Sequence, residues 1–322
     1  MQRLKIAFLH DWGHPINEYI DTEDGLPAAI ELISKFHQVS WFAQGNSLEL
    51  SRGNARLILV PSERNLLERL DAEAPDVFIC WGSLDRPWHK AIHERYKSIP
   101  KVLCFAGGPR DHIARSYFNV IVCESQCYID DFTRVGVTAV RAFGTNTDVF
   151  EPRRLPKVWD AIYPASLCFH KNLELFAKSI GSRGLCVGNH NEPTIASKVL
   201  SLGTSLMHRV SSRTLSDLYN MSNCTVITCG PEGGAQRVVL ESMACGVPVV
   251  VMSDHDRCVE FVKESGFGKV VHPVDIEIRE AVGELMLNPM DKNIGVDYVK
   301  SKWTQNHYAD SIMSAVNKVM LN

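Results

Sequence analysis

The chain has 322 residues, with 34 Lys and Arg against 37 Asp and Glu, a formal net charge of −3, and 45% hydrophobic residues. This is the composition of an ordinary globular protein, and a chain of this length usually holds about two domains. Residues 1–150 carry 16 basic and 19 acidic side chains, and residues 151–322 carry 18 of each. Because neither half is basic, the charge argues against a protein that neutralises many phosphates of a nucleic acid.

No segment approaches the about 20 apolar residues that span a bilayer, and Ile6–Leu9 is too short for the core of a signal peptide. We therefore expect a cytoplasmic protein, while peripheral contact with a membrane stays open. The cysteines form no Cys-x-x-Cys pair, and several lie in apolar runs: Cys80, Cys104, Cys123 and Cys229. This favours buried, reduced thiols over disulfides or metal ligands.

Short β-branched or aromatic runs alternate with amphipathic runs, which predicts parallel strands joined by crossover helices. In the first half we expect strands at 4–10, 39–42, 57–60, 77–81, 101–106, 120–123 and 139–142, and helices at 26–36, 64–72, 87–96 and 125–135. In the second half we expect strands at 160–163, 185–187, 226–229, 247–252 and 269–271, and helices at 173–180, 214–221, 235–245, 258–264 and 276–286.

The polar, turn-forming segment 143–152 ends in a proline and marks a domain boundary. We place the first domain at 1–146 and the second at 147–322. A last helical pattern runs from about 304 to 320, with Tyr308, Ile312, Val316 and Met320 at i, i+4 spacing. This helix either packs on its own domain or crosses back to the first.

The most informative segment runs from Gly230 to Met252. It predicts a strand end, a glycine-rich turn, a helix and a second buried strand. Glycines before a helix let backbone N–H groups approach an anion, and the helix dipole favours negative charge there. Glu241, two turns into the helix, can accept hydrogen bonds from sugar hydroxyls. The alternative is a plain tight turn followed by a solvated Glu241.

Residues 232–250, Glu-Gly-Gly-x-x-Arg-Val-Val-Leu-Glu-x-Met-Ala-Cys-Gly-Val-Pro-Val-Val, resemble the donor-site signature of retaining GT-B glycosyltransferases of the family 4 (glycosyl transferases group 1) type. Residues 144–152, 165–172 and 209–219 resemble other segments of that family. The resemblance is strong across 143–272 and weaker in the first half. It implies an α/β GT-B fold, with two Rossmann-like domains facing each other across a cleft, the first binding the acceptor and the second the donor.

The resemblance also implies roles for single residues. Lys171 would contact the donor diphosphate, Glu241 would bind the ribose hydroxyls, and Val210 would lie near the base. The backbone amides that would hold the same phosphates belong to Gly233, Gly234 and Ala235.

The sequence departs from the family pattern at two places. Eight residues separate Glu232 from Glu241, one more than in the family, so either Glu232 still reaches the sugar as a catalytic group or that contact is absent. Ser166 replaces a diphosphate-binding arginine, and a serine cannot make a bidentate charged contact. Either Arg237 or Arg209 compensates, or the affinity for the donor is lower.

The first half would supply the acceptor side of the site. Gly25 is what remains of a glycine-rich helix start, and the preceding Asp24 fits an N-cap. Family members often carry a histidine that faces the donor sugar after the strand at 101–106. His112 is the nearest candidate for this catalytic position, with Arg110 beside it, and the alternative is a loop histidine without a role.

Together these features predict a hexosyltransferase-like enzyme that moves a sugar from a UDP- or GDP-sugar to an acceptor hydroxyl, and the resemblance implies retention of configuration. Positive side chains and helix dipoles would stabilise the leaving diphosphate, so we expect no required metal and no cofactor besides the nucleotide-sugar co-substrate. The acceptor, whether saccharide, lipid-linked or small molecule, is unknown, and nothing indicates a nucleic acid. The alternatives are a nucleotide-sugar epimerase or hydrolase on the same fold and a non-catalytic nucleotide-binding protein. A dehydrogenase ranks last.

Overall fold

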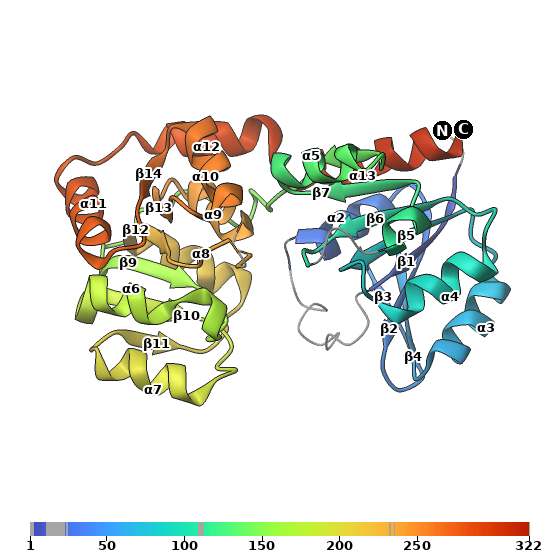
Figure 1. Cartoon of the computed structure of the whole chain (residues 1–322), viewed down its shortest axis with the longest axis horizontal. Coiled ribbons are helices and arrows are strands. Elements are labelled where there is room, and N and C mark those ends of the chain that lie inside the picture. Colours follow the sequence, from blue (N-terminus) through green and yellow to red (C-terminus); the bar gives the residue numbers. More distant parts are fainter. Residues whose placement is uncertain are drawn as a thin grey trace. The chain divides into compact units, whose positions relative to one another are not determined.

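The computed structural model describes residues 3–10, 23, 25–108, 113–231, 233–234 and 236–321. The chain divides into two compact units, the first made of Met1–Phe143 with Gln305–Asn322 and the second of Gly144–Thr304 (Figure 1). The structural boundary thus follows Phe143, three residues before the position expected from the polar segment.

The first unit contains both strands and helices. Its strands are β1 (Lys5–Leu9), β2 (Gln38–Gln44), β3 (Leu48–Arg52), β4 (Ala55–Val60), β5 (Val77–Gly82), β6 (Lys101–Phe105), β7 (Val120–Cys123) and β8 (Ala139–Arg141). Its helices are α2 (Gly25–Ser34), α3 (Glu63–Glu73), α4 (Pro87–Arg95), the 3-10 helix η1 (Ile113–Tyr117), α5 (Gln126–Arg134) and α13 (Gln305–Met320).

These strands form a sheet of order β3-β4-β2-β1-β5-β6-β7-β8. Neighbouring strands pair in parallel, except that β3 pairs antiparallel with β4. Side chains of β1 point alternately to the two faces of the sheet. Ile6 and Phe8 pack with α2 and α13 on one face, while Ala7 and Leu9 pack with α3, α4 and α5 on the other. The sheet therefore has an apolar core on each side, as a parallel sheet covered by helices requires.

The last helix, α13, belongs to the first unit although it follows the second in sequence (Figure 1). Tyr308, Ile312 and Val316 are buried in the core that α2 also lines. Met320, the last residue of the expected apolar stripe, is 39% exposed. Of the two placements that the sequence left open for this helix, the structure shows the one in which the chain crosses back to the first unit.

The second unit is built from a further set of elements. Its strands are β9 (Trp159–Pro164), β10 (Gly184–Val187), β11 (Ser205–Met207), β12 (Ser222–Ile227), β13 (Val249–Met252) and β14 (Gly268–Val271). Its helices are α6 (Leu173–Ile180), α7 (Pro193–Ser201), α8 (Ser212–Asn220), α9 (Gln236–Ala244), α10 (Asp256–Ser265), α11 (Asp275–Leu287), α12 (Lys292–Lys302) and the 3-10 helices η2 (Phe169–Lys171) and η3 (Gly181–Arg183).

Its sheet has the order β11-β10-β9-β12-β13-β14, and every neighbouring pair is parallel. One face is covered by α6, α7 and α11, and the other by α8, α9 and α10, while α12 packs on α9 and α10. Both units are thus helix-covered Rossmann-like sheets, as expected from the sequence.

Local sequence signals begin and end several of these helices. Ser211 caps the N-terminus of α8, since its side chain accepts a hydrogen bond from the Thr214 N–H. Gly266 ends α10 with a left-handed φ of 66°, a conformation that favours glycine.

The sequence analysis missed β3, β11, α7 and α12. Both missed strands lie at sheet edges, and β11 has only three residues. Edge strands bury little, so their side chains need not form an apolar run.

Cys80, Cys104, Cys123 and Cys229 are buried, as expected from the apolar runs around them. Among the described residues, no helix combines the length and the apolar character that crossing a membrane requires.

The packing of α13 leads to a first prediction. Replacing Ile312, which is fully buried, by alanine should lower the free energy of unfolding by about 2–5 kcal/mol, because it leaves a cavity between α13 and the sheet. Ser314→Ala on the exposed side of the same helix should change it by less than about 0.5 kcal/mol. Urea unfolding of both variants measures the difference, and equal effects would show that α13 is not part of the core.

Candidate functional site

The second sheet reverses its direction of growth between β9 and β12. From β9 the chain adds β10 and β11 on one side, and then β12, β13 and β14 on the other. In open parallel sheets, the loops that follow two such strands diverge and leave room for a ligand. Lys171 follows β9 and Gly234 follows β12, and Lys171 Nζ donates to Gly234 O at 3.0 Å. Two residues predicted to bind the donor therefore meet at the topological switch point of one unit.

The backbone around Lys171 is held by a side chain of β9 and by one from the residue that follows β12. Lys171 ends η2, and the following Asn172 has a left-handed φ of 49°. Tyr163 Oη donates to Lys171 O at 3.2 Å, and Thr228 Oγ1 donates to Asn172 O at 2.9 Å. Burial raises the pKa of Tyr163 well above its ordinary value, so its hydroxyl remains a donor.

The two glycines before α9 differ in their surroundings. A Cβ on Gly233 would lie 2.4 Å from the Cβ of Cys229, whereas a Cβ on Gly234 would meet no atom closer than 3.8 Å. The carbonyl of Gly234 also accepts a bond from Cys229 Sγ at 3.2 Å. Close packing against Cys229 therefore requires glycine at position 233 but not at 234.

Glu241 lies on α9 and is only 5% exposed, which rules out the solvated alternative. Tyr219 Oη donates to Glu241 Oε2 at 2.7 Å. The Arg237 Nε lies 3.6 Å from Glu241 Oε1. Burial, together with the nearby carboxylate, raises the pKa of Tyr219 well above its ordinary value, so the phenol keeps the proton that it donates.

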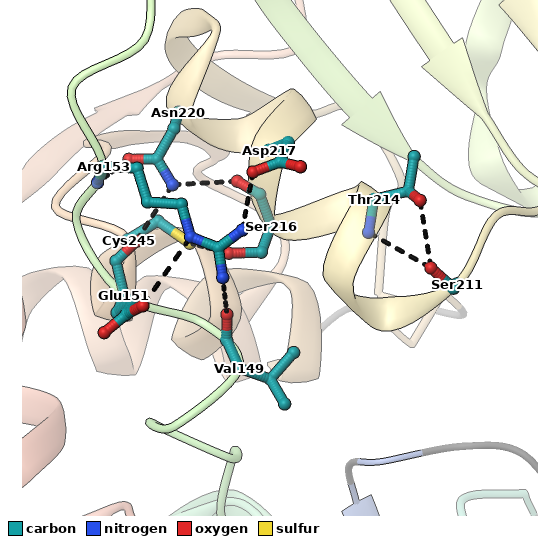
Figure 2. A network of polar contacts seen from close by, with 9 residues as sticks. All are labelled: Val149, Glu151, Arg153, Ser211, Thr214, Ser216, Asp217, Asn220 and Cys245. Carbon is teal, nitrogen blue, oxygen red and sulfur yellow. Dashed lines mark hydrogen bonds and ion pairs between the residues drawn. The ribbon is translucent and has the colours of Figure 1, made fainter.

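Tyr219 is carried by α8, and a polar network joins this helix to the chain that enters the unit (Figure 2). Arg153 Nη1 donates to Asp217 Oδ1 at 2.6 Å, and the Arg153 N–H donates to Asn220 Oδ1 at 2.7 Å. Arg153 Nη2 also donates to Val149 O, and Asn220 Nδ2 donates to Glu151 O. The segment predicted to join the domains is thus held on the helix that supports the buried glutamate.

Arg209 and Val210 follow β11, the edge strand that the sequence did not predict. Arg209 is exposed and Val210 is half-buried. Beside them, His208 stacks on His190 with ring centroids 3.9 Å apart. The segment that the resemblance assigns to the base is therefore flanked by two imidazoles.

Sequence reasoning missed a buried arginine at the glycine-rich turn. Arg257, in the first turn of α10, is 8% exposed and donates to Gly233 O at 2.9 Å and to Pro231 O. His255 caps the same helix by accepting from the Cys258 N–H at 3.3 Å. Burial lowers the pKa of His255, which keeps this imidazole neutral next to the arginine. Because Arg257 contacts only carbonyl groups of the turn in these bonds, no sequence motif could have revealed it.

The first unit places Gly25 as the buried first residue of α2, where its carbonyl accepts a bond from Gln305 Nε2 at 2.7 Å. The first sheet reverses between β1 and β5, and there Trp81 packs edge-on against His10 with centroids 4.8 Å apart.

Four of the predicted site residues lie outside the described residues: Arg110, His112, Glu232 and Ala235.

Among the described residues, no group of three or more His, Cys, Asp or Glu side chains could hold a metal ion. Asp254 and Asp256 form an Asp-x-Asp triplet around His255, and both aspartates are exposed.

The contrast between the two glycines leads to a second prediction. Gly233→Ala should lower the free energy of unfolding by about 1–3 kcal/mol, because its Cβ would overlap Cys229. Gly234→Ala, the matched control, should change it by less than about 1 kcal/mol. Urea unfolding compares the two, and equal losses would contradict the packing argument.

A third prediction concerns the support of Glu241. Tyr219→Phe removes the donor to a buried carboxylate and should destabilise the protein by about 1–3 kcal/mol. Tyr298 Oη donates to the carboxylate of Glu264 in an exposed pair, so Tyr298→Phe should change stability by less than about 1 kcal/mol. Thermal unfolding of both variants tests the difference. If Tyr219→Phe left the stability unchanged, the burial of Glu241 would not depend on this bond.

Comparison with solved structures finds the same fold in several glycosyltransferases. A sucrose-phosphate synthase from Thermosynechococcus elongatus matches with a TM-score of 0.78 and 12% identity, over 99% of this chain and 100% of that chain. A glycosyltransferase from Rickettsia africae matches with a TM-score of 0.76 and 14% identity, over the whole of both chains. The Anabaena protein HepE, solved in complex with UDP-glucose, matches with a TM-score of 0.71 and 14% identity, over 98% of this chain and 100% of that chain.

No curated protein is similar in sequence at a significant level. Residues 189–300, which contain the glycine-rich turn, Arg257 and Glu241, match the family described as Glycosyl transferases group 1. The chain therefore has the GT-B fold, and the expected resemblance to the family Glycosyl transferases group 1 is confirmed over residues 189–300 of the second unit.

Proposed function

We propose that this chain is a retaining glycosyltransferase that transfers a sugar from a nucleotide-diphosphate sugar to an acceptor hydroxyl. The observation that carries the proposal is the contact of Lys171 Nζ with Gly234 O across the switch point, directly before the N-terminus of α9. A cation, backbone amides and the positive end of a helix dipole gather there, which is what a diphosphate needs. The family match and the UDP-glucose complex of the Anabaena neighbour support the same reading.

In this proposal Lys171, whose ammonium has three N–H donors, keeps its bond to Gly234 O and adds a charge-assisted bond to a phosphate oxygen. Its backbone is already fixed by Tyr163 and Thr228, so only the flexible side chain has to be ordered when the donor binds. The same cation stabilises the negative charge that develops on the leaving diphosphate, and the proposed reaction requires no metal or cofactor.

Glu241 would accept hydrogen bonds from the ribose hydroxyls of the donor. Its Oε2 is already bonded to Tyr219, and a carboxylate oxygen has room for further donors. Sugar hydroxyls are suitable donors for a buried carboxylate, because such a group needs hydrogen-bonding partners to offset its burial.

The remaining roles are proposed from the resemblance alone. Val210 would lie near the base, Glu232 and His112 would face the transferred sugar, and Gly25 with Arg110 would lie on the acceptor side.

A panel of UDP-, GDP- and ADP-glucose tests the donor site by thermal shift. A ligand present at 100 times its dissociation constant should stabilise the wild type by about 2.7 kcal/mol. Lys171→Ala should weaken the binding of the same ligand by about tenfold or more, because it removes a charge-assisted bond. Lys178→Ala is the matched control, since Lys178 is exposed and paired with Glu174 at 2.8 Å. If no member of the panel shifted the wild type, or if Lys171→Ala responded like Lys178→Ala, the proposed donor site would be wrong.

Product analysis with the donor that binds separates the proposed reaction from its alternatives. Transfer that depends on an added acceptor and is unchanged by EDTA supports a metal-independent glycosyltransferase. Free sugar or an epimer formed without an acceptor would indicate a hydrolase or epimerase. Donor binding without turnover would favour a non-catalytic nucleotide-binding protein.

A further inference from the structure

Ser166 stands where the resemblance expects a diphosphate-binding arginine, so a positive charge is missing from the loop after β9. The two arginines that the sequence offers as substitutes are placed elsewhere in the unit. Arg237 lies beside the Glu241 carboxylate at 3.6 Å, and Arg209 is exposed after the edge strand β11. The structure instead brings Arg257 to the glycine-rich turn.

Arg257 reaches the turn because β12 and β13 are neighbours in the sheet. The loops that follow these strands therefore lie side by side, and α10 begins next to the turn that precedes α9. From α10, Arg257 Nη2 donates to the carbonyl oxygens of Pro231 and Gly233, the latter at 2.9 Å. Only 8% of the arginine is exposed, so the guanidinium lies under the turn rather than in solvent.

This contact fixes the orientation of a peptide group. In a planar trans peptide, the C=O of one residue and the N–H of the next point in opposite directions. Because Gly233 O points toward Arg257, the N–H of Gly234 points away from it. Arg257 therefore holds the Gly233 carbonyl toward the interior of the unit. The Gly234 N–H then points outward, to the position where a phosphate would lie.

A second cation acts on the next peptide group, since Lys171 Nζ donates to Gly234 O at 3.0 Å. Two successive carbonyl groups of the turn thus each accept a bond from a cationic side chain. The neighbouring His255 is kept neutral by burial, and Asp254 lies on the side of Gly230, with its Oδ2 3.6 Å from where a Cβ of that glycine would be.

We propose that Arg257 is a positioning residue of the diphosphate site: it holds the glycine-rich turn with its amides directed at the phosphates and supplies from beneath the positive charge that Ser166 does not. This inference rests on the proposed function. It assigns to Arg257 no contact with the donor, because Nη2 of the arginine donates to the carbonyl side of the turn.

The test compares Arg257→Gln, Arg257→Lys and wild type in binding UDP and uridine, or the corresponding guanine pair if the donor panel selects GDP-glucose. Arg257→Gln keeps a hydrogen-bond donor but loses the charge. It should weaken the affinity for UDP by about tenfold or more while changing the affinity for uridine by less than about threefold. Arg257→Lys restores the charge and should recover part of the UDP affinity. Titration calorimetry measures UDP, and NMR titration at millimolar concentration measures uridine.

Arg279→Gln is the matched control, because Arg279 also donates to two carbonyl oxygens of the second unit, those of Lys178 and Ser179. It should leave both affinities unchanged. Thermal unfolding of every variant without ligand separates a folding defect from a binding defect.

The inference would be overturned if Arg257→Gln bound UDP like wild type, or if it weakened UDP and uridine equally, which would indicate a purely structural arginine. Those results would leave the proposed donor site standing as long as wild type bound UDP and Lys171→Ala did not. Failure of the wild type to bind any nucleotide would instead remove the proposed function and the inference together.

Discussion

The orientation of two carbonyl groups decides what the turn between β12 and α9 can hold. The Gly233 carbonyl accepts from Arg257 and the Gly234 carbonyl accepts from Lys171, so both oxygens are occupied by cationic donors. A carbonyl oxygen of the turn without such a donor, if it faced the proposed phosphate position, would repel the anion. Gly233 can take this conformation only without a side chain, because Cys229 packs against it. One steric constraint and two charged hydrogen bonds together prepare the N-terminus of α9 for negative charge.

The buried glutamate on the same helix depends on a different part of the unit. Its partner Tyr219 lies on α8, and α8 is held to the segment 149–153 through Arg153. The ring of Tyr219 also packs edge-on against Phe150 of that segment, with centroids 6.0 Å apart. The chain that enters the second unit therefore contacts the residue that positions Glu241. A substitution in this segment that displaced Tyr219 would therefore act first on Glu241, the residue proposed to bind the ribose.

The sequence predicts the central strands well because a strand buried on both faces must be a continuous apolar run, as in Val249–Met252. It fails at β3, where Leu48 and Leu50 remain exposed at a sheet edge, and at the three-residue β11. For the candidate site, Lys171 and Gly234 could be predicted because their residue types and spacing resemble a known signature. Arg257 could not, because an arginine that binds backbone carbonyls leaves no partner residue type to recognise. Tyr219 lies within a recognisable segment, but only the fold shows its hydroxyl at the glutamate.

The hydrogen-bonding partners of its cations also bear on how a chain without a basic half would bind the proposed diphosphate. Arg153 pairs with Asp217 and Arg183 with Asp160, so a carboxylate cancels the charge of each arginine. At the glycine-rich turn, Lys171 and Arg257 each donate to a carbonyl oxygen, which carries no formal charge. A partly buried positive charge is screened little by solvent, so its field extends to a nearby ligand. Residues 151–322 thus carry 18 acidic and 18 basic side chains, and two of the basic ones, Lys171 and Arg257, donate to the glycine-rich turn that follows β12. In the proposed donor site, the placement of these two cations at the turn, rather than the number of cations in the chain, would favour an anion at that edge of the sheet.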